Sequence, residues 1–265
     1  MIDYHLHTAR CCHAAGTLEE YLTEAEKKCL EEIGFADHFP LGLLGYEPRK
    51  QVTMHPEELE TYMNQVNVLK KRSSSISIKL GIEIDYLPGY EDRINELLGR
   101  FEFDYVIGSI HFIGDWDFTH PVYADDYKHK DLEEIYRHYY ELVSQAIKSG
   151  LFDIIGHIDV VKKFGYRPAS NFDSTRLAIA RLLKETNTCL ELNTAGKDAP
   201  VGEFYPDRDF LALCCAEGVD ITLGSDAHAP DQVGRYFTEA LELLKQTGYR
   251  SLTLFKQREK IAQPL

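Results

Sequence analysis

The sequence predicts an α/β protein built as a distorted (β/α)7 TIM-like barrel. Short apolar segments alternate with amphipathic helices about seven times along the 265 residues, which indicates parallel strands with helices outside. Histidine or carboxylate residues end nearly every apolar segment, and barrels of this kind build their sites at the carboxyl ends of the strands. An open doubly wound sheet is the alternative, but it would concentrate its ligands at one switch point. We therefore expect a closed barrel in which residues 1–265 form a single domain.

The first half of the chain supplies four of the expected strands. Thr17 and Glu20 form a capping box, and apolar residues at helical spacing follow it. Pro56 opens a second helix, and residues 76–84 alternate as a strand does. The strands expected here are the segment that ends at His7, then 33–36, 76–84 and 103–110. The expected helices are 17–30, 56–72 and 92–98, with a long loop at 41–55.

The second half repeats the same order. Asp131 caps a long amphipathic helix that Gly150 ends. The expected strands are 152–155, 188–192 and 219–223. The expected helices are 131–149, 174–185, 208–217 and a last one carrying apolar residues from 233 to 244. A loop is expected at 112–130. The pattern does not define whether the short run 252–255 joins the barrel.

Composition excludes several classes of protein. The formal net charge is −14, which disfavours a nucleic-acid partner because that role needs clustered Lys and Arg. No signal peptide or bilayer-spanning apolar run is present, so we expect no membrane partner. The six cysteines include no Cys-x-x-Cys, and reduced thiols in a cytoplasmic protein are the expected state.

The residues that end the apolar segments share one chemistry, that of metal ligands. Side chains two residues apart in a strand point to the same side, so His5 and His7 would project together. The other strand-end residues are His38, Glu83, His111, His157 with Asp159, and Asp226 with His228, while His13 lies in the first loop. Imidazole and carboxylate ligands without cysteine suit Zn, Fe, Mn or Co in open sites. The set exceeds what one ion needs, so we expect two or three divalent ions and hydrolysis of a phosphate ester.

These motifs resemble those of the polymerase and histidinol phosphatase (PHP) superfamily, in order and over essentially the whole chain. The motifs are His5-x-His7, Asp37-His38, Gly81-Ile82-Glu83, Ser109-Ile110-His111, Gly156-His157-x-Asp159 and Ser225-Asp226-Ala227-His228. Further stretches are similar to the histidinol-phosphate phosphatases of that superfamily, among them residues 12–16, 83–91, 162–168 and 193–196.

The resemblance implies how the ligands divide among up to three ions. His5, His7, Glu83 and Asp226 match one set; Glu83, His111 and His157 match a second that shares Glu83; and His13, His38 and His228 match a third. Asp159 has no such match and is expected to orient His157 or a strand-end amide.

Substrate contacts are expected from other loops. A guanidinium fork matches phosphate oxygens, and the family pattern points to Arg167, with Arg208 a second choice. Ser225 could donate a further hydrogen bond. The loop that holds Trp116, Asp117, Phe118 and His120 resembles an aromatic and acidic loop of the family, and could cover a substrate with a cationic amine and an imidazole.

The expected activity is hydrolysis of L-histidinol phosphate to L-histidinol and phosphate, a step of histidine biosynthesis. A hydroxide bridging two ions is expected to attack phosphorus, Arg167 to hold the phosphoryl charge, and Asp226 or His228 to protonate the leaving oxygen. One alternative is a PHP phosphoesterase that acts on another small phosphomonoester or a nucleotide. The other is a non-catalytic metal-binding barrel. A nuclease role is disfavoured by the negative charge.

Overall fold

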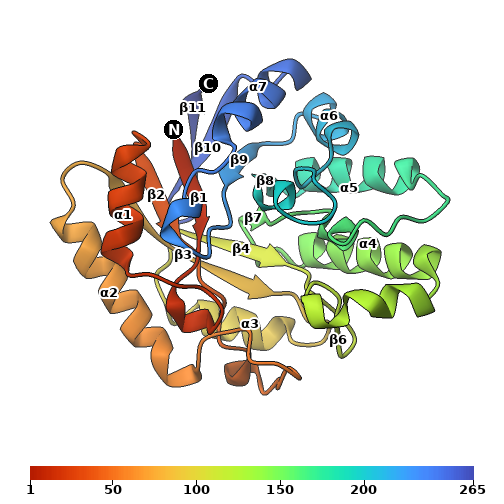
Figure 1. Ribbon diagram of the computed structural model, residues 1–265, viewed down its shortest axis with the longest axis horizontal. Coiled ribbons are helices and arrows are strands. Elements are labelled where there is room, and N and C mark those ends of the chain that lie inside the picture. The colour runs from red at the N-terminus through yellow and green to blue at the C-terminus, as the bar shows by residue number, and fades with distance from the viewer.

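The computed structural model describes all 265 residues and places seven parallel strands around one barrel (Figure 1). The strands are β1 (Ile2–Leu6), β2 (Glu32–Phe35), β3 (Ser77–Asp85), β4 (Tyr105–Ser109), β7 (Ile154–Ile155), β8 (Cys189–Asn193) and β9 (Ile221–Gly224). They are hydrogen-bonded in that order. The His7 amide donates to the Ala227 carbonyl at 3.0 Å and the Ala227 amide to the His5 carbonyl at 3.1 Å, which joins the last strand to the first. The predicted TIM-like (β/α)7 barrel is confirmed.

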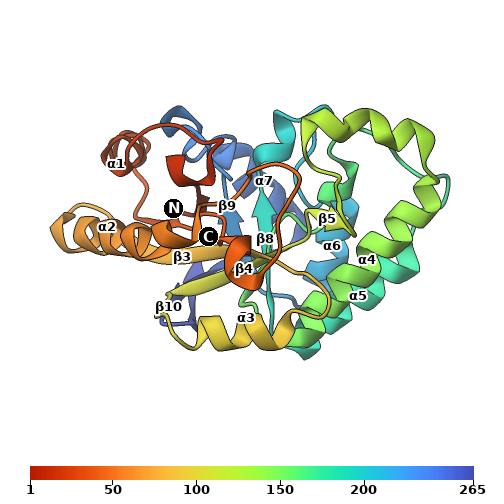
Figure 2. The same cartoon turned by 90° about the horizontal axis from the view of Figure 1, so that it is seen from below.

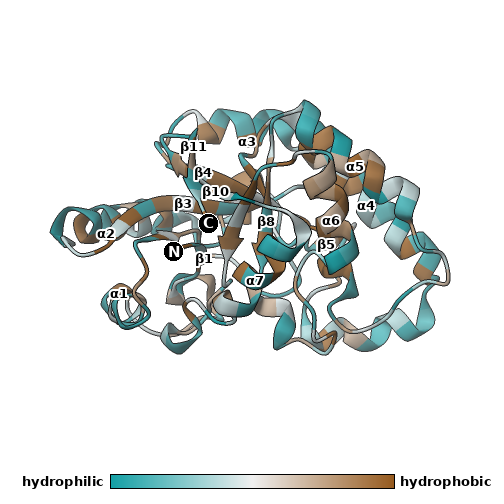
Figure 3. Cartoon of the chain, turned by 90° about the horizontal axis from the view of Figure 1, so that it is seen from above, coloured by the Kyte–Doolittle hydropathy of each residue, from teal (hydrophilic) through white to brown (hydrophobic).

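Seven α-helices cover the outside of the strands (Figures 1 and 2). They are α1 (Leu18–Lys27), α2 (Leu59–Arg72), α3 (Glu91–Leu98), α4 (Leu132–Ser149), α5 (Asp173–Glu185), α6 (Arg208–Ala216) and α7 (Phe237–Thr247). Their boundaries follow the capping signals: the Asp131 side chain accepts from the Glu133 and Glu134 amides, and Gly150 ends α4 at φ 67°. Hydrophobic residues concentrate on the strands and on the helix sides that face them (Figure 3). No helix has the length and apolar character needed to cross a bilayer.

Aromatic rings fill the amino-terminal end of the barrel. Tyr4 and Tyr105 stack with ring centroids 4.8 Å apart, and the Tyr105 hydroxyl donates to the Tyr4 carbonyl at 2.6 Å. A Cβ at Gly34 or Gly81 would lie 2.0 or 2.4 Å from the Tyr105 side chain, so only glycine fits beside this ring. The packing leaves the opposite, carboxyl-terminal end free for a polar site.

The structure answers one question that the sequence left open and adds detail to one expected loop. The run 252–255 belongs to β10 (Ser251–Lys256), which pairs with β11 (Glu259–Pro264) as a separate antiparallel hairpin and does not extend the barrel. Phe255 of this hairpin packs against Tyr4 and Tyr105 and so closes the amino-terminal end. The loop 112–130 contains a small hairpin, β5 (Phe112–Ile113) with β6 (Trp116–Asp117), and a 3-10 helix over Pro121–His129.

Candidate metal centre

Glu83, at the end of β3, is the centre of the polar cluster at the carboxyl ends of the strands. One carboxylate oxygen, Oε2, lies 2.9 Å from His38 Nδ1 and 3.4 and 3.6 Å from the Nε2 atoms of His5 and His7. The other, Oε1, lies 3.0 Å from His157 Nε2. Both oxygens therefore face imidazole nitrogens from different strands, as a carboxylate shared between two metal ions would.

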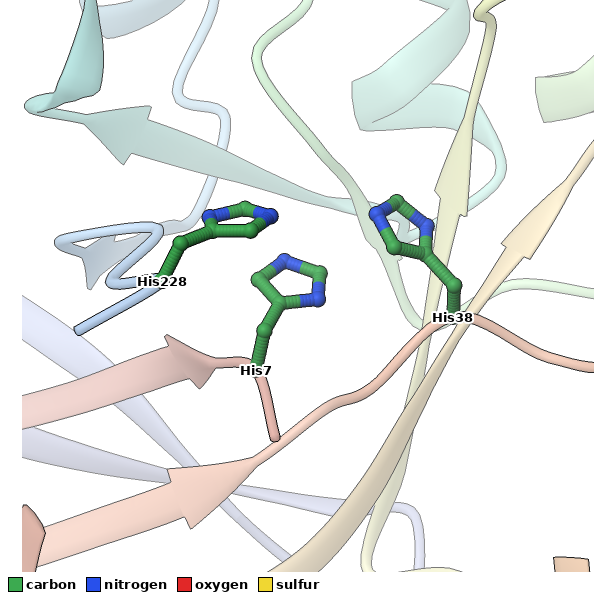
Figure 4. Close-up of side chains that lie close together, drawn as sticks. All are labelled: His7, His38 and His228. Atoms are coloured by element: carbon green, nitrogen blue, oxygen red, sulfur yellow. The ribbon is translucent and has the colours of Figure 1, made fainter. Parts of the chain in front are cut away.

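The remaining predicted ligands extend this cluster on two sides. Asp226 Oδ1 lies 3.1 Å from His7 Nε2, and His228 Nε2 lies 3.0 Å from His13 Nε2. On the other side, His111 Nε2 is 3.3 Å from His157 Nε2. Figure 4 shows the rings of His7, His38 and His228 gathered at the ends of their segments. The structure thus brings together all nine residues predicted to bind metal.

Several nitrogen and oxygen atoms in the cluster are buried without a hydrogen-bond partner. They are His5 Nε2, both ring nitrogens of His7, Glu83 Oε2 and His157 Nδ1. Buried polar groups left unpaired are costly. Three of these atoms, His5 Nε2, His7 Nε2 and Glu83 Oε2, lie close together, and a bound cation would complete this arrangement. His7, His38 and His228 offer one group of ligand atoms, and His5, His7 and Glu83 another. The donor set therefore fits divalent cations.

The electrostatics of the cluster favour ionised carboxylates. Burial alone would raise the pKa of Glu83, but His38, His5 and His157 lower it well below its usual range. Asp226 behaves likewise because His5 and His7 face it, so its pKa is also well below normal. Burial, His38 and His7 lower the pKa of His13 to about 4, which keeps this ring neutral and able to bind a cation.

Two of the predicted ligands have unusual backbone conformations. His157 has φ 25° and Asp226 has φ 51°, values that side-chain-bearing residues seldom adopt. Strain of this kind persists where surrounding contacts impose it, and it is common at functional sites. At His157 such a contact is the hydrogen bond that its amide donates to Glu191 Oε2 at 2.8 Å.

Glu191, inside β8, is a part of the site that sequence reasoning missed. Its side chain is 1% exposed, and its Oε1 lies 2.6 Å from His5 Nδ1. Since Nδ1 of His5 faces this carboxylate, Nε2 is left to face Glu83 and Asp226. Asp85 holds His111 in the same way, with Oδ1 2.8 Å from Nδ1. The available signal was the single acid within the otherwise apolar segment 188–192.

Asp159 has neither of its two expected roles, because the amide that it binds is at the N-cap of α6 and not at a strand end. It accepts from the Asp207 amide at 2.9 Å, beside the Tyr205-Pro206 segment that follows β8, and pairs with buried Lys162 at 2.7 Å. It therefore anchors a loop and does not orient His157.

A cavity of about 530 Å³ opens above the cluster. Asp117 and His120 of the predicted covering loop line it, together with Gln51, Phe112, Lys163 and Tyr205, and seven of the nine predicted ligands form its floor. Asp117 is held in place because its Oδ1 accepts from the Thr119 amide at 3.1 Å and the His120 amide at 3.0 Å. The cavity has the volume typical of small-molecule sites.

Other residues predicted to contact substrate lie elsewhere. Arg167 is exposed and pairs with Glu203 at 2.7 Å, and Arg208 is exposed at the start of α6, so neither guanidinium lines the cavity. Phe118 is fully buried, and Trp116 packs on Tyr127 with Lys130 over its ring. These two aromatic side chains support the loop from behind. Ser225 is also buried, beneath the cluster, where its amide donates to Asp3 at 2.9 Å.

A closed barrel with clustered histidines and carboxylates at the carboxyl ends of its strands is the architecture of a metal-dependent hydrolase. Comparison with known proteins identifies the family to which the chain belongs. The PHP domain family matches residues 3–195, and a probable histidinol-phosphatase of Deinococcus radiodurans is 37% identical over 98% of both chains. The chain therefore belongs to the PHP family, on its histidinol-phosphatase branch, as the motifs predicted. The histidinol-phosphatase of Bacillus subtilis is 29% identical over 91% of this chain and 98% of that protein.

Solved structures give the same relationship. The histidinol phosphate phosphatase of Lactococcus lactis, crystallised with zinc, L-histidinol and phosphate, superposes with a TM-score of 0.82 at 27% identity, over 98% of both chains. A histidinol phosphatase structure from Listeria monocytogenes has a TM-score of 0.81 at 27% identity, over 90% of this chain and 99% of that one.

Proposed function

We propose that this protein hydrolyses L-histidinol phosphate to L-histidinol and phosphate with two or three divalent ions, of zinc, iron or manganese. The observation that carries the proposal is the convergence of nine imidazole and carboxylate side chains under one cavity of suitable size. The zinc, L-histidinol and phosphate bound by the Lactococcus lactis relative support the choice of substrate.

The predicted ligand groups keep their assignment in this proposal. His5, His7, Glu83 and Asp226 would hold one ion; Glu83, His111 and His157 would hold the second; and His13, His38 and His228 would hold the third. Ions bound there would supply Lewis-acid activation of water and of the phosphoryl group. Asp226 and His228 line the cavity, and we assign to them proton transfer to the leaving oxygen as well as ligation. Because the pKa of Asp226 lies well below its usual range, the transferred proton would first be taken from the attacking water.

The substrate amine belongs at Asp117. This carboxylate is 7% exposed, lines the cavity, and accepts hydrogen bonds from Thr119 and His120 through Oδ1. The second oxygen, Oδ2, is thus available to a cation. Asp115, two residues earlier, is exposed and does not line the cavity. His120 beside Asp117 is positioned to contact the substrate imidazole.

Turnover by the purified protein tests the proposal. Histidinol phosphate should be hydrolysed faster than a panel of other phosphomonoesters and nucleotides, and a chelator should abolish the activity. Faster turnover of a nucleotide would favour the alternative phosphoesterase. Absence of turnover on every ester by metal-loaded protein would favour a non-catalytic barrel.

We also propose a cytoplasmic location. All six cysteines are unpaired, including Cys11 and Cys12 beside the metal centre, and free thiols are typical of reducing compartments. Fractionation of cells that produce the protein would test this.

A further inference from the structure

We infer that Lys163 is the protein cation that binds the phosphate group of the substrate. The identity of the substrate rests on the proposed function, whereas the phosphate site itself rests on the geometry around Lys163. The family pattern predicted Arg167 for this role, four residues further along the chain.

The backbone fixes Lys163 at the edge of the cavity. The 3-10 helix Val160–Lys162 follows directly after His157 and Asp159, and the Lys163 amide donates to the Val160 carbonyl at 2.9 Å. The Lys163 carbonyl in turn accepts from the Val201 amide at 3.1 Å. The residue is thus tied both to the turn after β7 and to the loop after β8, and its position relative to His157 is set.

The ammonium group of Lys163 has no partner within the protein. No hydrogen bond or ion pair joins it to another side chain, and its closest aromatic neighbour is Phe164, 5.8 Å from the ring centroid. Burial lowers the pKa of Lys163, and the charges of Asp226 and Asp117 raise it in part. A half-buried, unpaired cation that lines the same cavity as Asp226, a predicted metal ligand, is a site for an anion that also contacts the metals.

Every other nearby cation is already engaged. Lys162 is 1% exposed and lies 2.7 Å from Asp159. Arg167 pairs with Glu203 at 2.7 Å, and Arg235 donates to the Ser225 and Asp226 carbonyls, each at 3.0 Å. Lys163 is the only Lys or Arg among the residues that line the cavity.

The placement of Lys163 also explains how one substrate could use both ends of the cavity. In histidinol phosphate the amine is on the carbon next to the one that carries the ester oxygen. The charges that act on Lys163 are those of Asp226, a predicted metal ligand, and Asp117, the proposed amine site. A phosphate between the metals and Lys163 would therefore leave the adjacent amine within reach of Asp117.

Four variants test the inference: Lys163→Met, Lys163→Arg, Arg167→Met for the rival assignment, and Lys148→Met as a matched control at an exposed site on α4. Calorimetry measures the binding of inorganic phosphate to the metal-loaded protein. Steady-state kinetics give KM for histidinol phosphate, and elemental analysis gives the metal content. In Lys163→Met we expect the Kd of phosphate and KM to rise about 10- to 100-fold with metal content unchanged, because a charge-assisted hydrogen bond is lost. Lys163→Arg should recover part of the loss, and Lys148→Met should match the parent.

The opposite pattern would overturn the inference. Phosphate binding that is weakened by Arg167→Met and left intact by Lys163→Met would return the role to Arg167. Loss of metal from Lys163→Met would show that Lys163 supports the ion cluster and not the substrate. If the parent does not hydrolyse histidinol phosphate but its phosphate binding still depends on Lys163, the proposed substrate fails and the phosphate site stands.

Discussion

His5 Nδ1 lies 2.6 Å from Glu191 Oε1, and the His157 amide donates to the other oxygen of the same carboxylate at 2.8 Å. One buried side chain on β8 thus orients a predicted ligand from β1 and another from the end of β7. Because carboxylate partners fix the tautomer and raise the basicity of metal-binding imidazoles, Glu191 should control how tightly the ions are held.

Replacing Glu191 tests this relationship. We expect Glu191→Gln to weaken metal binding about 10- to 100-fold, since the imidazole of His5 loses a charged partner while the side-chain volume is kept. Metal affinity is measured by titration with a competing chelator. Glu242→Gln, at an exposed position of α7, is the matched control. Unchanged affinity in Glu191→Gln would show that the contact only supports the fold.

The site residues that belong to local sequence motifs could be predicted, whereas those whose contacts depend on strand register could not. His5, His7, Glu83 and Asp226 end apolar segments, so the barrel architecture alone brings them to one rim. Glu191 lies within its strand, opposite Thr222 of β9, and only the packing between strands shows which ligands it reaches.

Turn geometry limited the prediction of the substrate residues. Lys163 lies on the turn that ends the 3-10 helix and Arg167 lies beyond it, so the conformation of that turn decides which of them faces the cavity. The terminal hairpin was missed for a different reason. Residues 259–264 are mostly exposed and lack apolar alternation, so β11 is formed by pairing with β10 and leaves no hydrophobic pattern to read.

Removal of Glu83 should empty the centre. Its two oxygens face five imidazoles, and Glu83→Ala would leave those rings without their shared acidic partner. We expect loss of at least one ion per chain and a fall in kcat/KM of roughly a thousandfold or more, as for other residues that assemble a reaction centre. His157→Ala should behave similarly. Retention of the full metal content in both variants, measured by elemental analysis, would contradict the assigned ligand sets.

Metal binding should depend on pH through His7 and His111. In the metal-free protein, burial lowers the pKa of both rings, but neighbouring carboxylates outweigh it. Asp226 and Asp37 raise the pKa of His7 to about 9. Asp85 and Glu83 raise the pKa of His111 to about 9. Protonation of these rings stabilises the metal-free fold. This contribution to stability is fully present below the pKa of the unfolded-state imidazoles, about 6.5, and is lost as pH rises through about 9. A metal ion requires neutral rings, so binding should release protons and the apparent affinity should rise with pH up to about 9. Titrations in buffers of different ionisation enthalpy measure the proton release; affinity that is independent of pH would contradict it.

Asp117 should discriminate substrates by their amine. Asp117→Asn keeps the Oδ1 acceptor for Thr119 and His120 but removes the charge that would face the substrate. We expect KM for histidinol phosphate to rise about 10- to 100-fold, the loss of one charge-assisted contact, with little change for a phosphomonoester that lacks an amine. Asp115→Asn, at an exposed position, should leave both values unchanged. An equal effect of Asp117→Asn on both esters would mean that the residue acts on the loop or the metals.

Gly224 on β9 has no room for a side chain because the space beside it is filled by the Glu191–His5 contact. A Cβ there would lie 2.1 Å from Glu191 Oε1 and 2.7 Å from His5 Cβ, and both of these groups are buried and cannot move to solvent. Gly224→Ala should therefore destabilise the fold by about 1–3 kcal/mol, the usual cost of overpacking, and also lower the metal content. Thermal unfolding with and without added metal separates the two effects. Gly99→Ala, where the nearest atoms to the new Cβ are carbonyl oxygens at 3.5 Å, should change stability by less than about 1 kcal/mol. A Gly224→Ala variant as stable and as well loaded as the parent would show that Glu191 can leave His5 without consequence, and would remove the basis for its positioning role.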